Sequence, residues 1–129
     1  MIVVDSSVWI ALIRDRNTPE VIRLRTISNP AQIIVGDIVL LEVLRGARSD
    51  KHATYLQKEL AAFAQATMLS PEIAVKAAAN FRLLRAKGIT IRKTADLIIG
   101  TYCMEHGHSL LHADRDFDPM AEHLGLRIA

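Results

Sequence analysis

Short runs of β-branched residues, each followed directly by a polar or glycine position and a helical pattern, constrain this chain most. Residues 1–4 form one such run, which stops at Asp5, and residues 33–35 form a second, which stops at Gly36. Neither run alternates apolar with polar residues, which is typical of central strands covered on both faces. The sequence therefore predicts an α/β fold with a mostly parallel sheet and helices on both faces.

Caps, turn residues and helical spacing predict the remaining elements. We expect helices after Asp5, over residues 19–27, after Asp37, and over residues 49–64, 71–87, 94–107 and 119–123, with Thr94 as the cap of the sixth. Short strands are also expected at residues 109–111 and 126–128, and residues 67–69 could form another, so we expect four to five strands in total.

Composition limits the class of protein. A chain of 129 residues that is 50% hydrophobic fits one domain spanning residues 1–129. The single Cys103 excludes an intramolecular disulfide framework and a multi-cysteine metal site. A net charge of +2 is compatible with a nucleic-acid partner without demanding one. We expect a cytoplasmic protein without a membrane span, because no signal-peptide pattern is present and charges interrupt every apolar run before ~20 residues.

Several acidic residues lie at the ends of predicted strands or at the starts of predicted helices. Asp5 and Asp114 follow predicted strands, and Asp96 lies in the first turn of a predicted helix. Ligands bind parallel sheets at the carboxyl ends of strands, so these side chains can face one crevice. Glu42 lies among apolar residues, and two interpretations stay open: a surface pair with Arg45, or a carboxylate aimed into the pocket of Asp5.

Gathered carboxylates need a cation. Two of them about 4 Å apart repel by roughly 4 kcal/mol at an effective dielectric near 20, so four could not stay ionised alone. An all-oxygen ligand set favours Mg²⁺, with Mn²⁺ as the alternative, over zinc. Such an ion activates water and neutralises charge on a phosphodiester, so the chemistry suggested is phosphodiester hydrolysis.

Other polar residues near these acids are candidates for auxiliary roles. His112 precedes Asp114 and is placed to hold a water or a substrate phosphate, whereas the other histidines are expected to be structural or solvated. The densest basic region, near Asp96, could meet a phosphate backbone. The candidate substrate-binding cations are Arg92, Lys93 and Arg115.

Together these segments resemble the PIN-domain ribonucleases, and within them the VapC toxins of type II toxin–antitoxin modules. The segments VVDSSVWI, DIVLLEVLRG, TADLIIGTYC and LLHADRDFD match the family's four acids in order, over essentially the whole chain. The resemblance implies a PIN-like three-layer sandwich and a Mg²⁺-dependent endoribonuclease that inhibits translation. It also implies metal ligation by Asp5, Glu42, Asp96 and Asp114, with Asp116 as an auxiliary acid.

The same resemblance carries further expectations. Ser6 matches the small hydroxyl beside the first acid, and His112 replaces the serine or threonine common before the fourth, where we expect imidazole to substitute. The implied partners are RNA, with transfer RNA as a family-based guess, a cognate VapB-like antitoxin whose tail occupies the active-site groove, and a second copy of the chain in a homodimer.

Two other functions use similar features. A receiver-like phosphoacceptor signalling module also combines an α/β sheet with an acidic Mg²⁺ pocket, but this chain lacks a lysine at a late strand end. A non-catalytic PIN-like binding protein would keep the fold without the chemistry.

Overall fold

A four-stranded, fully parallel sheet forms the centre of the protein, whose computed structural model describes all residues from 1 to 129. The strands are β1 (Ile2–Val4), β2 (Ile33–Gly36), β3 (Ala64–Ala66) and β4 (Ser109–Leu111), in the spatial order β3-β2-β1-β4. In register, Val3 of β1 lies opposite Ile34 on one side and Leu110 on the other. The predicted α/β class with a parallel sheet is confirmed.

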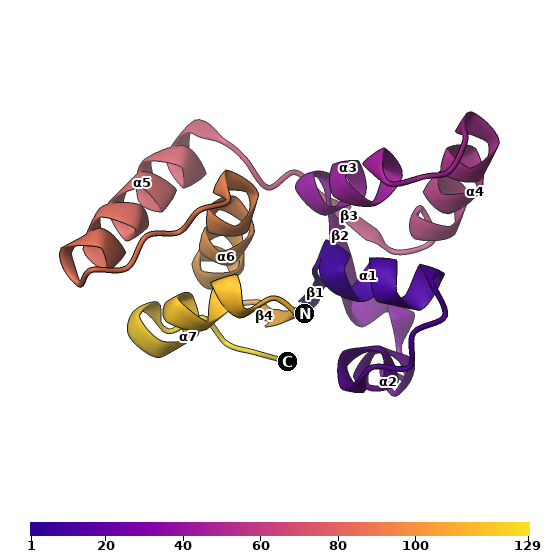
Figure 1. Ribbon diagram of the computed structural model, residues 1–129, viewed down its shortest axis with the longest axis horizontal. Coiled ribbons are helices and arrows are strands. Elements are labelled where there is room, and N and C mark those ends of the chain that lie inside the picture. Colours follow the sequence, from indigo (N-terminus) through magenta and orange to yellow (C-terminus); the bar gives the residue numbers. More distant parts are fainter.

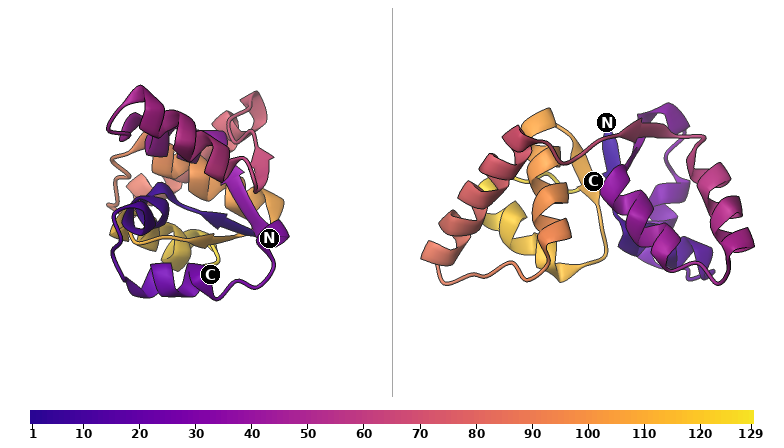
Figure 2. Two further views of the ribbon diagram at one scale, coloured as in Figure 1. Left: turned by 90° about the vertical axis from the view of Figure 1, so that its right-hand side faces the viewer. Right: turned by 90° about the horizontal axis from the view of Figure 1, so that it is seen from above.

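Helices cover both faces of this sheet. Figures 1 and 2 show the strands between two groups of helices, α1 to α4 on one side and α5 to α7 on the other. None of the helices combines the length and apolar composition that crossing a membrane requires. The helices are α1 (Ser6–Ile13), α2 (Pro19–Arg25), α3 (Asp37–Arg45), α4 (Asp50–Leu60), α5 (Pro71–Ala86), α6 (Thr94–His106) and α7 (Asp118–Leu124), with short 3₁₀ turns η1 (Pro30–Gln32) and η2 (Arg115–Phe117).

The strand order reverses between β1 and β4. From β1 the chain moves outward through β2 to β3, and it then returns to the other side of β1 to form β4. In parallel sheets this reversal is where ligands bind, beyond the carboxyl ends of the strands. The backbone N–H of Asp5 continues the pairing there by donating to the Leu111 carbonyl at 2.9 Å.

Burial explains why the central strands are apolar throughout. Val3, Val4, Val35 and Leu110 are almost completely inaccessible, because helices pack on both faces of the sheet. The edge strand β3 differs, since Ala64 and Gln65 are exposed. It therefore carries no apolar signature.

Three local predictions are wrong. The strand expected at residues 67–69 lies instead at Ala64–Ala66, paired with β2. Met68 attracted the prediction because it is apolar, but it is a fully buried core residue packed over Gly36. Residues 126–128 do not form a strand. They pair with β4 only through one isolated bridge, between Leu110 and Ile128. Thr94 is the first residue inside α6, whose cap is Lys93 without a side-chain cap bond.

Candidate active site

Asp5 lies where β1 passes into α1. It is the N-cap of α1, with only 3% of its surface exposed. Its Oδ2 atom accepts hydrogen bonds from the Ser7 backbone N–H at 3.0 Å and from the Ser7 hydroxyl at 2.5 Å. Its Oδ1 atom is buried and has no hydrogen-bond partner. Because burying an unpaired carboxylate oxygen is costly, this atom needs a ligand.

Asp96 lies in the first turn of α6 and is equally inaccessible, at 3% exposure. Its Oδ2 atom is also buried without a partner. Burial, followed by the negative charges of Asp5 and Asp114, raises the pKa of Asp96 to about 7, against the opposing effect of the Lys93 ammonium. The Asp96 carboxylate thus lies in a site crowded with negative charge.

Glu42 lies within α3 and points to the same site. Its Oε1 atom accepts a hydrogen bond from the Ser6 hydroxyl at 3.1 Å. Burial, followed by the negative charge of Asp5, raises the pKa of Glu42. The Ser6 hydrogen bond and the charges of Arg45 and Lys93 lower this pKa by less, so the net shift is upward. Since no ion pair joins Glu42 to Arg45, the structure favours the pocket-facing interpretation over the surface pair.

Asp114 and Asp116 form the other wall, in the turn after β4. Asp114 caps η2 by accepting from the Asp116 N–H at 3.0 Å through Oδ1. Carboxylate oxygens of Asp96, Asp114 and Asp116 lie within 4.8 Å of one another. Burial alone would raise the pKa of Asp114, but the Asp116 N–H and the Lys93 ammonium outweigh it and hold that pKa below its usual range.

The donor set fits a hard divalent cation. All the groups are carboxylates, and two of their buried oxygens, Asp5 Oδ1 and Asp96 Oδ2, lack any partner. Asp5 and Glu42 lie outside the tightest group but are near enough to raise the pKa of Asp96. A cation between these residues would relieve both the missing contacts and the repulsion, so Asp5, Asp96 and Asp114 could hold it, with Glu42 and Asp116 beside them.

Some of the predicted auxiliary and substrate-binding residues contact the acids, and others do not. Ser6 is buried and holds Glu42. His112 packs on Phe117 with ring centroids 4.9 Å apart, and its Nδ1 atom accepts the Asp114 N–H at 3.1 Å, so only Nε2 is left for a water or phosphate. Arg92 and Arg115 are exposed and form no ion pair with the acids, whereas Lys93 forms one.

Ser7 is a site residue that the sequence reasoning missed. Besides donating to Asp5, its hydroxyl accepts the backbone N–H of Ala113 at 3.1 Å. It thereby connects the first acid to the loop that carries Asp114, across 106 positions of sequence. The local signal was available, because an aspartate at an N-cap commonly bonds the residue two positions on.

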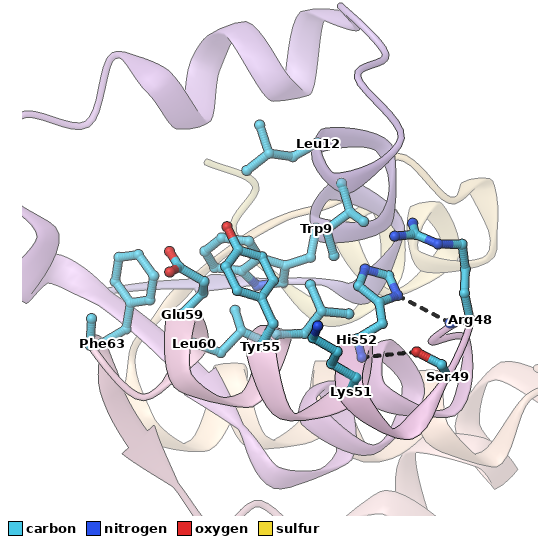
Figure 3. Close-up of a pocket in the computed structure, with 13 residues that line it drawn as sticks. Trp9, Leu12, Arg48, Ser49, Lys51, His52, Tyr55, Glu59, Leu60 and Phe63 are labelled. Carbon is cyan, nitrogen blue, oxygen red and sulfur yellow. Dashed lines mark hydrogen bonds between the residues drawn. The ribbon is translucent and has the colours of Figure 1, made fainter.

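A separate groove of about 800 Å³ lies between α1 and α4 and contains none of the acids of the candidate active site, although Glu59 lines it. Figure 3 shows Trp9, Leu12, Tyr55 and Phe63 along it, with Arg48 and Lys51 among the polar side chains that line it. Trp9 is only 5% exposed and packs on Phe63, yet its indole N–H has no acceptor. The groove is therefore mostly apolar, with Arg48, Lys51 and Glu59 as its charged lining residues.

Comparison with known proteins agrees with this architecture. The PIN domain family matches residues 2–123, and the chain belongs to that family. Ribonuclease VapC11 of Mycobacterium tuberculosis is 29% identical over 132 residues, which cover 100% of this chain and 98% of that protein. The VapC ribonuclease Mb1587 of Mycobacterium bovis matches with the same identity and coverage.

Solved structures share the fold at low sequence identity. VapBC2 from Rickettsia felis, bound to a DNA fragment from their promoter, has a TM-score of 0.79 at 17% identity over 100% of this chain and 98% of that one. VapBC-1 from nontypeable Haemophilus influenzae has a TM-score of 0.76 at 16% identity, covering 100% and 97%. VapC20 of Mycobacterium tuberculosis, a sarcin-ricin loop cleaving toxin, has a TM-score of 0.66 at 19% identity, covering 92% and 93%.

Proposed function

We propose that this protein is a divalent-metal-dependent endoribonuclease, the toxin of a VapBC-type toxin–antitoxin module that inhibits translation. One observation carries the proposal: carboxylates from four separate segments converge at the carboxyl ends of β1 and β4, and two of their buried oxygens lack a partner. The family and the relatives named as ribonucleases support the same function.

We assign separate roles to the residues of the site in metal binding, proton transfer and RNA binding. A bound Mg²⁺ or Mn²⁺ would supply charge neutralisation at the scissile phosphate and activation of water. Asp5 and Asp96 are buried at the starts of α1 and α6, and two hydrogen bonds from Ser7 hold the Asp5 carboxylate in place. Glu42, fixed by Ser6 and only half-buried, is placed to accept a proton from the attacking water. Arg92 and Arg115 are exposed cations that we assign to the RNA phosphates.

The substrate that we propose is RNA, and transfer RNA is the class to test first. Brief expression of the wild-type chain should arrest growth and leave new RNA ends, whereas Asp5→Ala should do neither. Sequencing those ends separates cuts in transfer RNA from cuts in ribosomal RNA. An Asp5→Ala chain that cleaves normally would contradict the proposal, and a stable aspartyl phosphate after incubation with a small phosphodonor would favour the receiver-like alternative.

A VapB-like antitoxin is the partner that we propose for the groove between α1 and α4. The solved structures similar to this chain include toxin–antitoxin complexes, and a cognate partner would bring an apolar segment to this surface. Apolar side chains of the partner would pack on the apolar residues of the groove, and its acidic residues would complement Arg48 and Lys51. From the groove its tail is proposed to continue to the acids.

We also propose a homodimer that works in the cytoplasm, where its RNA substrate lies. The outer side of α5 exposes Val75, whose surface is 70% accessible, and Leu83, which suits contact with a second copy. Light scattering after gel filtration should report twice the mass of the chain. Val75→Glu should shift the equilibrium toward a monomer, and a wild-type chain that stays monomeric at high concentration would remove this part of the proposal.

A further inference from the structure

Lys93 is the only cation that forms an ion pair with the acids of the candidate site. Its Nζ atom lies 2.9 Å from Asp114 Oδ2 and 3.8 Å from Asp116 Oδ2. From the sequence, this lysine was expected to bind substrate together with Arg92 and Arg115. The structure separates it from them, because those two arginines form no ion pair with the acids.

The ion pair places the Lys93 ammonium on a carboxylate oxygen of the proposed metal site. Asp114 Oδ1 accepts the Asp116 N–H, and Asp114 Oδ2 accepts from Lys93, so both oxygens of Asp114 already have a partner. The unpartnered oxygens belong to Asp5 and Asp96. A cation that bridges Asp96 and Asp114 would therefore meet an oxygen already paired with the Lys93 ammonium, and the two positive charges would repel each other.

The Lys93 side chain can also move away from Asp114 and Asp116. Its side chain is 56% exposed, and its residue caps α6 without any side-chain bond to the helix. The backbone is thus anchored at the helix start while the four-carbon stem remains free to swing into solvent. Exposed ion pairs of this kind are weak enough for a divalent ion to displace.

We propose that Lys93 is a built-in counterion of the metal site: it neutralises Asp114 and Asp116 when no metal is bound, and metal binding displaces it. Lys93 therefore stabilises the metal-free protein and weakens the apparent metal affinity. The proposal rests on the proposed metal site and adds a competing group to it.

The test is direct Mn²⁺ binding to the full chain, without RNA, by isothermal titration calorimetry. Lys93→Gln should lower the Mn²⁺ dissociation constant about fivefold, the size expected for removing one exposed ion pair. Lys87→Gln is the matched control, because Lys87 is exposed, follows α5, forms no ion pair, and loses the same charge. Its dissociation constant should stay within about twofold of the wild type, since an exposed charge that pairs with none of the acids is largely screened.

A second measurement is the thermal stability of the metal-free protein. In EDTA, Lys93→Gln should lower the melting temperature more than Lys87→Gln does, because the acids lose their only paired cation, and Lys93→Arg should restore both properties. An unchanged or higher Mn²⁺ dissociation constant in Lys93→Gln would overturn the counterion role while leaving the nuclease proposal intact. A wild-type chain that binds no Mn²⁺ would overturn both.

Discussion

Ser6 and Glu42, which are 36 positions apart in the sequence, are joined by a hydrogen bond of 3.1 Å from the serine hydroxyl to the glutamate carboxylate. The next residue, Ser7, makes the equivalent bond to Asp5. Two adjacent hydroxyls at the start of α1 thus hold two different acids of one site. This arrangement makes the roles of the two serines separable by mutation.

Ser7→Ala is expected to lower Mg²⁺ affinity and RNA cleavage by roughly 10-fold to 100-fold, the usual effect of removing a group that orients a metal ligand. It also removes the acceptor for the Ala113 N–H, so the free energy of unfolding should fall by about 1 kcal/mol. Ser7→Thr keeps the hydroxyl and should retain most activity. Urea unfolding and metal titration check the two effects, and equal activity in Ser7→Ala and Ser7→Thr would remove the positioning role.

Asp96→Asn should abolish metal-dependent cleavage while keeping the fold. The substitution removes one charge from the proposed ligand set, so we expect a loss of about 100-fold or more. Without metal, the Asp96→Asn variant avoids the buried, crowded negative charge, so its melting temperature in EDTA at about pH 8 should equal or exceed that of the wild type. Cleavage assays and thermal melts are the measurements, and full retained activity would exclude Asp96 from the site.

The raised pKa of Asp96 also predicts a pH dependence of stability. Its folded pKa of about 7 exceeds the unfolded value near 3.9, so the folded state binds the proton more tightly. The stabilisation is fully present below about pH 4 and is lost as pH rises to about 7. In EDTA, the melting temperature of wild type minus that of Asp96→Asn should therefore fall across this window. A difference that is flat with pH would contradict the shift.

Tyr55→Glu should weaken antitoxin binding at least about tenfold, because it places a charge in the apolar groove between α1 and α4. Tyr55 is exposed, so the fold should tolerate the change. Gln57→Glu is the control, since Gln57 is exposed on the same helix but does not line the groove. Titration with the antitoxin measures both, and equal affinities for the two variants would place the antitoxin elsewhere.

Gly100→Ala tests the packing of α6 on α7. A Cβ atom at this position would collide with the sulfur of Met120, which is fully buried. We expect a net loss of about 1 kcal/mol in the free energy of unfolding, because overpacking by about 1–3 kcal/mol exceeds the helix-propensity gain of about 1 kcal/mol. Adding Met120→Ala should make the effect of Gly100→Ala smaller, and equal effects in both backgrounds would place the strain elsewhere.

Sequence patterns predicted the central strands, the succession of helices and the acids that end β1 and β4, because apolar runs and caps are local properties. The edge strand β3 was misplaced, since its exposed Ala64 and Gln65 carry no apolar signal and the buried Met68 beside them does. The bond between Ser7 and Asp5 follows a local N-cap pattern and was predictable from the sequence. The second contact of Ser7, with Ala113, joins segments that no local pattern relates.

The sequence by itself determined the parallel α/β class and which residues are acidic at strand ends and helix starts, since burial on both faces requires continuous apolar strands. Only the tertiary structure decided that Glu42 turns toward Asp5 rather than Arg45, that Ser7 bridges two acid-bearing segments, and that Lys93 pairs with Asp114. The physical reason is that these contacts depend on how distant elements pack. A short-range carboxylate or ammonium interaction forms only where the sheet and its helices bring both partners together.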